Sequence, residues 1–264
     1  MRTVVGLAWE RAWVRIAVLA AGFGLFELVV GLSYASVDQN AIRQLVEALP
    51  PALRALAGSA DISTPTGYAG SGYLHPVALA LPAAAAISMA AAPAREVEDG
   101  SAELILSRPV EPPRWLGAHA LAMATALAAV VTGGYLGGLT ASAVVDDLAP
   151  VDPGPLALAL LGSYLCFLAV GGVALLAASL ARTGGRVVGW AAGFVIVSYA
   201  VDYLAQVWSL AEPLGPLSIF RYLDPPAVLR TGSLGPEDVA ALGGLAVVTV
   251  AAALALVGRR DLAR

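Results

Sequence analysis

The 264-residue sequence contains no lysine, and all 15 of its basic residues are arginine. A phosphate-binding P-loop requires the lysine of its Gly-Lys-Ser/Thr motif, so this chain cannot carry such a nucleotide site. If ATP drives the protein, another polypeptide must bind the nucleotide. The single cysteine, Cys166, excludes an internal disulfide. The two histidines, His75 and His119, belong to no Cys/His/Asp cluster with metal-ligand spacing, so we expect neither a metal nor a cofactor in this chain.

Charge is also scarce. Charged residues make up 13% of the chain and hydrophobic residues 59%, with a mean hydropathy of +0.79. Soluble domains are roughly 45–50% apolar, so the composition indicates an integral membrane protein. Six apolar runs are long enough to cross a ~30 Å hydrocarbon core as helices: 16–34, 74–93, 115–140, 155–180, 187–208 and 239–257. We predict an all-α membrane protein whose residues 1–264 form a single transmembrane domain.

The segments outside these runs have their own patterns. Met1–Arg15 is predicted to be an amphipathic helix lying in the membrane interface, because tryptophan and arginine recur there at helical spacing. The polar segment Asp38–Ser71 carries an apolar stripe from Ile42 to Leu56, which predicts a pair of short external helices divided at Pro50-Pro51. Gly58–Gly72 is predicted to be a connecting loop.

Arginine is distributed unequally between the two sides that six spans define. One side carries Arg2, Arg11, Arg15, Arg95, Arg108, Arg114, Arg182, Arg186, Arg259, Arg260 and Arg264, and the other only Arg43, Arg54, Arg221 and Arg230. Basic residues are retained on the cytoplasmic side of a membrane. We therefore expect both termini, and the loop after the second span, to be cytoplasmic in a multi-pass protein of the cell membrane.

The most polar stretch of the chain, Arg95–Pro113, lies between the second and third runs. Gly100 interrupts any preceding helix, Ser101 is a candidate N-cap, and Glu103 then falls in the first turn, where the helix dipole favours a carboxylate. Pro109 prevents extension. This pattern predicts a short helix over Ser101–Ser107, although an ordinary solvated loop has the same spacing.

This stretch resembles the cytoplasmic loop after the second membrane helix in permease subunits of ABC exporters of the ABC-2 type. The matching residues are Glu96, Glu98, Gly100, Ser101, Glu103, Leu104, Leu106, Ser107, Pro109 and Val110. The sequence departs from the family at Glu111-Pro112-Pro113, where basic residues are usual. The ending Arg259-Arg260-Asp261-Leu262 also resembles the family, so the resemblance covers the whole chain.

The resemblance implies a transport subunit that is not itself an enzyme. Two copies of the chain, or one copy and a paralogue, would form the passage, and two separate ATPase subunits would bind ATP and Mg²⁺. The short helix would be the coupling helix that contacts the ATPase: its glutamates Glu96, Glu98 and Glu103 would meet basic groups there, and Leu104 and Leu106 would fill an apolar groove. Gly100, Ser101 and Ser107 complete this set of candidate coupling residues. No nucleic-acid partner is expected.

Two carboxylates fall within predicted spans, Glu27 and Asp202. A carboxylate in hydrocarbon is expensive and faces protein or water, so Glu27 either borders a substrate path or is a packing residue. Asp202, near the outer end of its span, fits a structural role. The glycines Gly133, Gly134, Gly137 and Gly138 allow close helix approach, which favours packing within the chain over a dimer seam.

Other classes of membrane protein remain as alternatives. A stand-alone carrier is expected to show internal repeats or broken helices, and an intramembrane enzyme is expected to concentrate polar side chains in its spans; the sequence shows neither. An accessory subunit of a membrane assembly complex would share the architecture. The apolar spans suit a lipophilic cargo, but contact with lipid requires the same residues, so the cargo is not specified.

Overall fold

The computed structural model describes residues 2–36, 38, 40–41, 44, 48, 62–107, 109–148 and 150–259. The elements are α1 Arg2–Tyr34, α4 Pro65–Gly72, α5 Pro76–Ala90, α6 Ala92–Glu98, α7 Ser101–Leu106, α8 Pro112–Val144, η1 Asp146–Leu148, α9 Pro153–Leu180, α10 Gly184–Val207, η2 Glu212–Leu217, η3 Phe220–Tyr222, α11 Pro225–Thr231 and α12 Pro236–Val257. The described residues contain no strand. Six helical segments are long and apolar enough to span a membrane, which confirms the predicted all-α fold class.

Proline marks where most helices begin. It occupies the first turn of α4, α5, α8, α9, α11 and α12, where its missing N–H needs no partner and its fixed φ suits a helix. The sequence had predicted that several of these prolines lie in loops. The third and sixth spans therefore begin at Pro112 and Pro236, earlier than the predicted residues 115 and 239.

The second span does not end at Pro93, as the sequence had suggested. α5 ends at Ala90, and α6 then begins at Ala92 with Pro93 in its first turn. Proline at this position starts a helix and does not stop one, so the apolar segment continues to Glu98. As a consequence, Glu96 and Glu98 lie on the last turns of a helix and not in a solvated loop.

The N-terminal part of the chain also differs from the prediction. α1 is one continuous helix from Arg2 to Tyr34, so the expected interfacial helix is not separate but continues into the first span, which begins at Ala12. No proline interrupts α1. Residues 49–61, with much of the expected external helix pair, lie outside the described residues. Pro65–Gly72 forms α4, where a loop was predicted, and the Thr64 hydroxyl caps it by accepting the Gly67 N–H at 3.2 Å.

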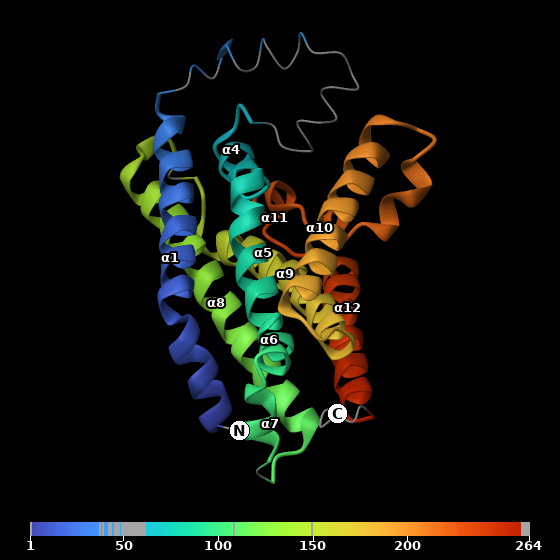
Figure 1. Cartoon of the computed structure of the whole chain (residues 1–264). Helices are drawn as coiled ribbons and strands as arrows, with labels where there is room; N and C mark the ends of the chain where they lie inside the picture. Colours follow the sequence, from blue (N-terminus) through green and yellow to red (C-terminus); the bar gives the residue numbers. More distant parts are fainter. Residues whose placement is uncertain are drawn as a thin grey trace.

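The helices form one bundle (Figure 1). The beginning of α1, the end of α12 and the short helix α7 lie at one end of this bundle, and α4 lies at the other. α5, α8 and α9 pack on one another in the centre, with α1 against α8 and α12 against α9. Because short connections join the long helices, α7 lies beyond the ends of the spans.

α1 and α8 pack backbone to backbone. A Cβ added at Gly24 of α1 would lie 2.7 Å from the carbonyl oxygen of Gly133, and Cβ atoms at Gly133 and Gly137 would overlap the backbone carbonyls of Ala20 and Gly24. Only glycine permits this approach. The glycines of α8 therefore serve packing within the chain, as the sequence favoured.

α10 is held differently. Its buried residues are Gly184, Val187, Ala191 and Ser198, so three of the four lie in its first two turns. Ser198 is buried against the segment that follows the helix, because its hydroxyl accepts the Ile219 N–H at 2.9 Å. The rest of α10 is exposed along most of its length, and the helix leans away from α5 toward its far end (Figure 1).

Candidate functional site

The short helix α7 projects beyond the spans as the sequence predicted. Gly100 separates it from α6 with φ 77°, a left-handed conformation that favours glycine. The Asp99 carboxylate accepts the Ser101 N–H at 2.9 Å, so Ser101 is the first residue of α7 and not its N-cap. Glu103 lies in the first turn and is exposed.

The apolar residues of α7 divide into two sets. Ile105 and Leu106 pack partly against the core of the bundle, whereas the Leu104 side chain is 75% exposed. Ser107, at the end of α7, is exposed as well. Leu104 and Glu103 are thus the candidate coupling residues that α7 presents outward, and Leu106 holds the helix to its own chain.

Glu96 is buried, with only 6% of the residue exposed. Its Oε2 accepts the indole N–H of Trp115 at 3.0 Å and lies 3.2 Å from Nε2 of His119. The rings of Trp115 and His119 meet edge to face, with centroids 5.4 Å apart. Glu96 therefore fastens α6 to α8 inside the chain, and in this conformation it is not available to basic groups on a partner.

Glu98 also turns toward its own chain. Its Oε2 accepts the backbone N–H of Gly184 at 2.9 Å, at the first residue of α10. A carboxylate at a helix N-terminus is favoured by the unpaired N–H groups there and by the helix dipole. The α6–α7 segment (residues 92–106) is consequently bonded to α8 through Glu96 and to α10 through Glu98.

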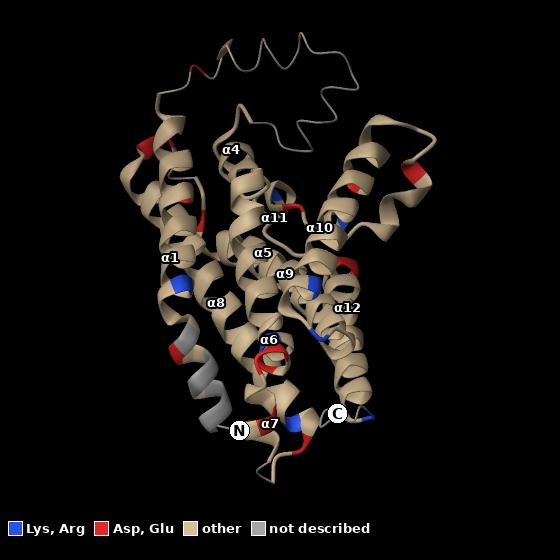
Figure 2. Cartoon of the chain, in the orientation of Figure 1, with Lys and Arg blue, Asp and Glu red and all other residues tan. Residues whose placement is uncertain are grey.

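Charged residues are concentrated near the helix ends, and the middle of α5, α8, α9 and α12 carries none (Figure 2). At the α7 end, Arg95, Arg114, Arg182, Arg186 and Arg259 lie near helix termini, whereas the opposite end carries Arg221 and Arg230. The described part of the chain therefore keeps the arginine asymmetry that the sequence predicted.

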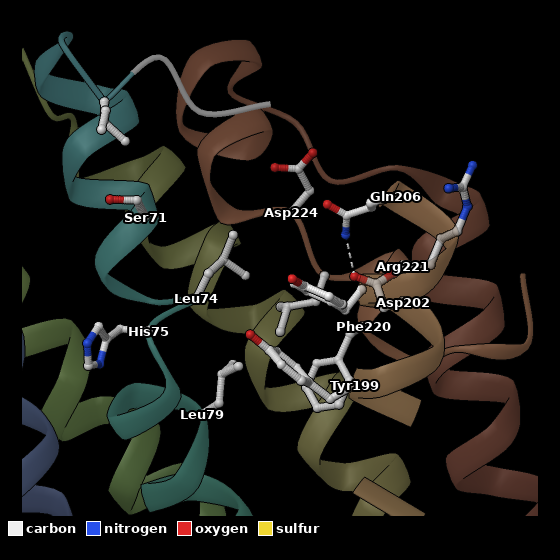
Figure 3. Close-up of a pocket in the computed structure, with 13 residues that line it drawn as sticks. Ser71, Leu74, His75, Leu79, Tyr199, Asp202, Gln206, Phe220, Arg221 and Asp224 are labelled. Atoms are coloured by element: carbon white, nitrogen blue, oxygen red, sulfur yellow. Dashed lines mark hydrogen bonds between the residues drawn. The ribbon is translucent and has the colours of Figure 1, made fainter. Parts of the chain in front are cut away.

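A pocket of about 500 Å³ opens at the end of the bundle away from α7, between α5 and α10 (Figure 3). We call it the α5–α10 pocket. It is lined by Ile62, Ser71, Leu74, His75, Leu79, Tyr199, Asp202, Tyr203, Gln206, Phe220, Arg221, Leu223 and Asp224. The volume is in the range of organic-ligand sites, and the wall combines apolar side chains with polar and charged ones, among them Asp202, Arg221 and Asp224.

The two walls of this pocket come from different units. Leu74 and Leu79 belong to the α4–α5 side, and Tyr199 with Phe220 to the α10 side, their rings edge to face at 5.7 Å (Figure 3). The Asp202 carboxylate accepts the Gln206 amide N–H at 2.6 Å. Asp202, for which the sequence favoured a structural role, thus lines the α5–α10 pocket.

Glu27 lies elsewhere, at a cavity of about 20 Å³ among α1, α4, α8 and η1. It is 3% exposed, and its Oε1 has no hydrogen-bond partner among the described residues. A space of this size holds about one water molecule, so the present conformation favours the packing interpretation. Nearby, burial and then the Glu27 carboxyl raise the pKa of Tyr73 well above its usual value, and the Tyr73 hydroxyl donates to the Gly134 carbonyl at 3.4 Å.

With this geometry in view, one comparison decides the class of protein. The family described as the C-terminal domain of the multidrug efflux system permease Rv1217c matches residues 1–259. The chain belongs to this permease family. No curated protein and no solved structure matches the chain. The resemblance to permease subunits of ABC-2 type exporters is thereby confirmed.

Sequence reasoning on this permease missed three functional neighbours. Trp115 and His119 are four residues apart, which places both side chains on one face of α8. This spacing could have indicated from the sequence that the two residues share a partner. Gly184 gave no such signal, because a backbone N–H is not visible in a sequence pattern.

Proposed function

We propose that this permease is the membrane-spanning subunit of an ATP-driven exporter, and that α7 is its contact with a separate ATPase. Two copies, or one copy and a paralogue, enclose the passage, and two ATPase subunits bind ATP and Mg²⁺ beneath them. The observation that carries the proposal is the exposed Leu104, next to the exposed Glu103, on a short helix beyond the spans. An apolar side chain of this kind in water favours a partner that covers it.

The arginines at the α7 end support an orientation in which α7 and both termini are cytoplasmic and the α5–α10 pocket opens on the outer side of the cell membrane. A pocket of about 500 Å³ whose wall combines aromatic and aliphatic side chains with Asp202, Arg221 and Asp224 suits a lipophilic organic cargo that also carries polar or charged groups. The name of the matching family supports export of such compounds.

Replacing Leu104 with Ala tests the proposal. Truncating a buried Leu costs about 2–5 kcal/mol in a protein core, and less at a partly wet interface. At about 1.4 kcal/mol per tenfold, we expect Leu104→Ala to weaken ATPase binding by roughly tenfold or more. The measurement is co-purification of the ATPase with the permease, together with stimulated ATP hydrolysis.

Leu217→Ala is the matched control, because Leu217 in η2 is also 75% exposed but lies on the pocket side. It should leave ATPase binding unchanged. If Leu104→Ala binds and stimulates the ATPase as well as the control does, α7 is not the contact, and the proposed role of this helix is wrong.

A further inference from the structure

The contact between Glu98 and Gly184 links two parts of the chain that lie 86 residues apart in sequence. The Glu98 carboxylate accepts the first backbone N–H of α10 at 2.9 Å. Hydrogen bonds to an ionised acceptor are roughly twice as strong as neutral ones. Glu98 is solvent-exposed, so water screens this bond in part, but the bond connects α6 directly to the backbone of α10.

A second contact from α6 reinforces this link. Arg95 and Glu98 are three residues apart and share one face of α6. A Cβ at Gly184 would come within 3.0 Å of the Arg95 Nε and closer still to its aliphatic chain. Gly184 is thus enclosed by Arg95 on one side and bonded to Glu98 on the other, so α6 holds the beginning of α10 at two points.

The remainder of α10 is able to respond to a displacement at Gly184. Beyond Ala191 it is packed less tightly: Phe194 and Val195 are partly buried against the core, and Ser198, which contacts the segment after α10, is the only fully buried residue. The Ser218 hydroxyl donates to the Ser198 carbonyl at 2.8 Å, so α10 and this segment form one bonded unit, with Ile219 and Phe220 of the segment buried in the core. That unit supplies Tyr199, Asp202 and Phe220 to one wall of the α5–α10 pocket.

The geometry points to Glu98 as a positioning residue that transmits the motion of α7 to the α10 wall of the pocket. This inference rests on the function proposed above. Glu96 fixes the other side of α6 to α8 through Trp115 and His119, so displacement of α7 tilts α6 about α8 and shifts Gly184. Tyr199 stands 15 residues further along α10, roughly 22 Å at 1.5 Å per residue, so a small tilt at Gly184 becomes a larger displacement at the pocket.

Two pairs of variants isolate the hydrogen bond. Gly184→Pro removes the donor, and proline is tolerated as the first residue of a helix after Thr183, which is extended (φ −134°, ψ 139°). Gly184→Ala places a Cβ against Arg95 as well but keeps the N–H. On the other side, Glu98→Ala removes the acceptor, whereas Glu98→Gln keeps an oxygen that can accept.

The experiment uses the permease–ATPase complex in lipid. Tyr203→Cys, in a Cys166→Ala background, reports on the α10 wall through its labelling rate with a membrane-impermeant maleimide. The rate is compared without nucleotide and with trapped ATP, alongside co-purification of the ATPase and transport. A thermal melt of each variant in detergent verifies that the spans still fold.

We expect Gly184→Pro and Glu98→Ala to bind the ATPase normally but to lose the nucleotide-dependent change in labelling, and transport with it. Glu98→Gln should retain both, and Gly184→Ala, which keeps the N–H but must displace Arg95, should lose less of the response than Gly184→Pro. If the Gly184→Pro and Glu98→Ala complexes still change their labelling with ATP, the inference is wrong while the proposed function stands. If the unmodified complex shows no response to ATP, or binds no ATPase, the proposed function fails and the inference falls with it.

Discussion

α1 and α10 both lie at the edge of the bundle, yet they are attached in different ways. α1 packs on α8 through glycines over several turns, with no side chain between the two backbones at Gly24 and Gly133. α10 is buried only at Gly184, Val187, Ala191 and Ser198. The first arrangement fixes a helix along its axis, whereas the second buries the first two turns of a helix and holds the remainder through the partly buried Phe194 and Val195 and through Ser198.

This difference indicates a division of labour. Packed interiors transmit strain because they do not deform continuously, so the α1–α8 seam is suited to act as a fixed frame. The α10 unit is suited to move against that frame and carries one wall of the pocket. The comparison predicts that changes at the seam affect folding, whereas changes on α10 affect transport.

The largest expected effect comes from filling the seam. Gly133→Ala/Gly137→Ala adds two Cβ atoms that overlap the backbone of α1 at Ala20 and Gly24. Overpacking costs about 1–3 kcal/mol per site and occasionally more, and here backbone must move. We expect a large drop in the melting temperature in detergent, or loss of folded protein altogether.

Gly189→Ala/Gly193→Ala on α10 is the matched control, with the same spacing and nothing within 4 Å of either added Cβ. Alanine has a higher helix propensity than glycine by up to about 1 kcal/mol, so this variant should melt at or above the temperature of the parent. If the two double variants lowered the melting temperature equally, α1 and α10 would not differ in how tightly they are packed.

A smaller loss of stability is expected at Glu96. Glu96→Ala leaves the N–H groups of Trp115 and His119 without their acceptor in a buried site, and each buried donor without a partner costs about 1–3 kcal/mol. Both bonds converge on Oε2, so Glu96→Gln keeps an acceptor at that position and should melt closer to the parent.

Glu103→Ala serves as the control for stability, since the Glu103 side chain is exposed on α7, and surface changes usually stay within about 0.5 kcal/mol. A Glu96→Ala protein as stable as Glu103→Ala would mean that Glu96 does not fasten α6 to α8.

The sequence predicted the parts of the fold that depend on the length of the apolar runs, and it was wrong where a proline sets the boundary of a helix. The spans follow from runs of Ala, Leu, Val and Gly, and the errors cluster at prolines: Pro93, Pro112 and Pro236 begin helices but were placed at span ends or in loops. A proline interrupts a helix in the interior and favours one at the first turn, and the sequence alone did not decide between these positions.

The candidate site was less predictable. Glu96, Glu98 and Glu103 read as one acidic motif, yet Glu96 is buried against α8, Glu98 is exposed but hydrogen-bonded to α10, and Glu103 is exposed on α7. Which partner each glutamate contacts depends on which face of α6 packs against which span. Packing between segments that are distant in sequence determines this. The α5–α10 pocket likewise joins α4, α5, α10 and the segment after α10, which no local pattern relates.

The smallest effect on stability and transport is predicted for substitution of Glu27. Asp202 is the matched position, because Glu27 lies on α1 and Asp202 lies on α10. Glu27 lines a cavity of about 20 Å³ next to the seam, whereas Asp202 lines the pocket of about 500 Å³. Glu27→Gln keeps the size of the side chain, and its Oε1 has no described partner to lose. Transport in reconstituted vesicles and the melting temperature should both stay close to those of the parent.

Asp202→Asn is also of equal size, and its oxygen can still accept from Gln206, so folding should again be unaffected. It removes a charge from the wall that cargo would touch, and we therefore expect a change in transport rate or in the preference between cationic and neutral cargo. A carboxylate in a membrane span is retained where it faces water or a path. If Glu27→Gln impairs transport more than Asp202→Asn does, the path runs along α1, and the side of the bundle taken here as the fixed frame is the side that moves.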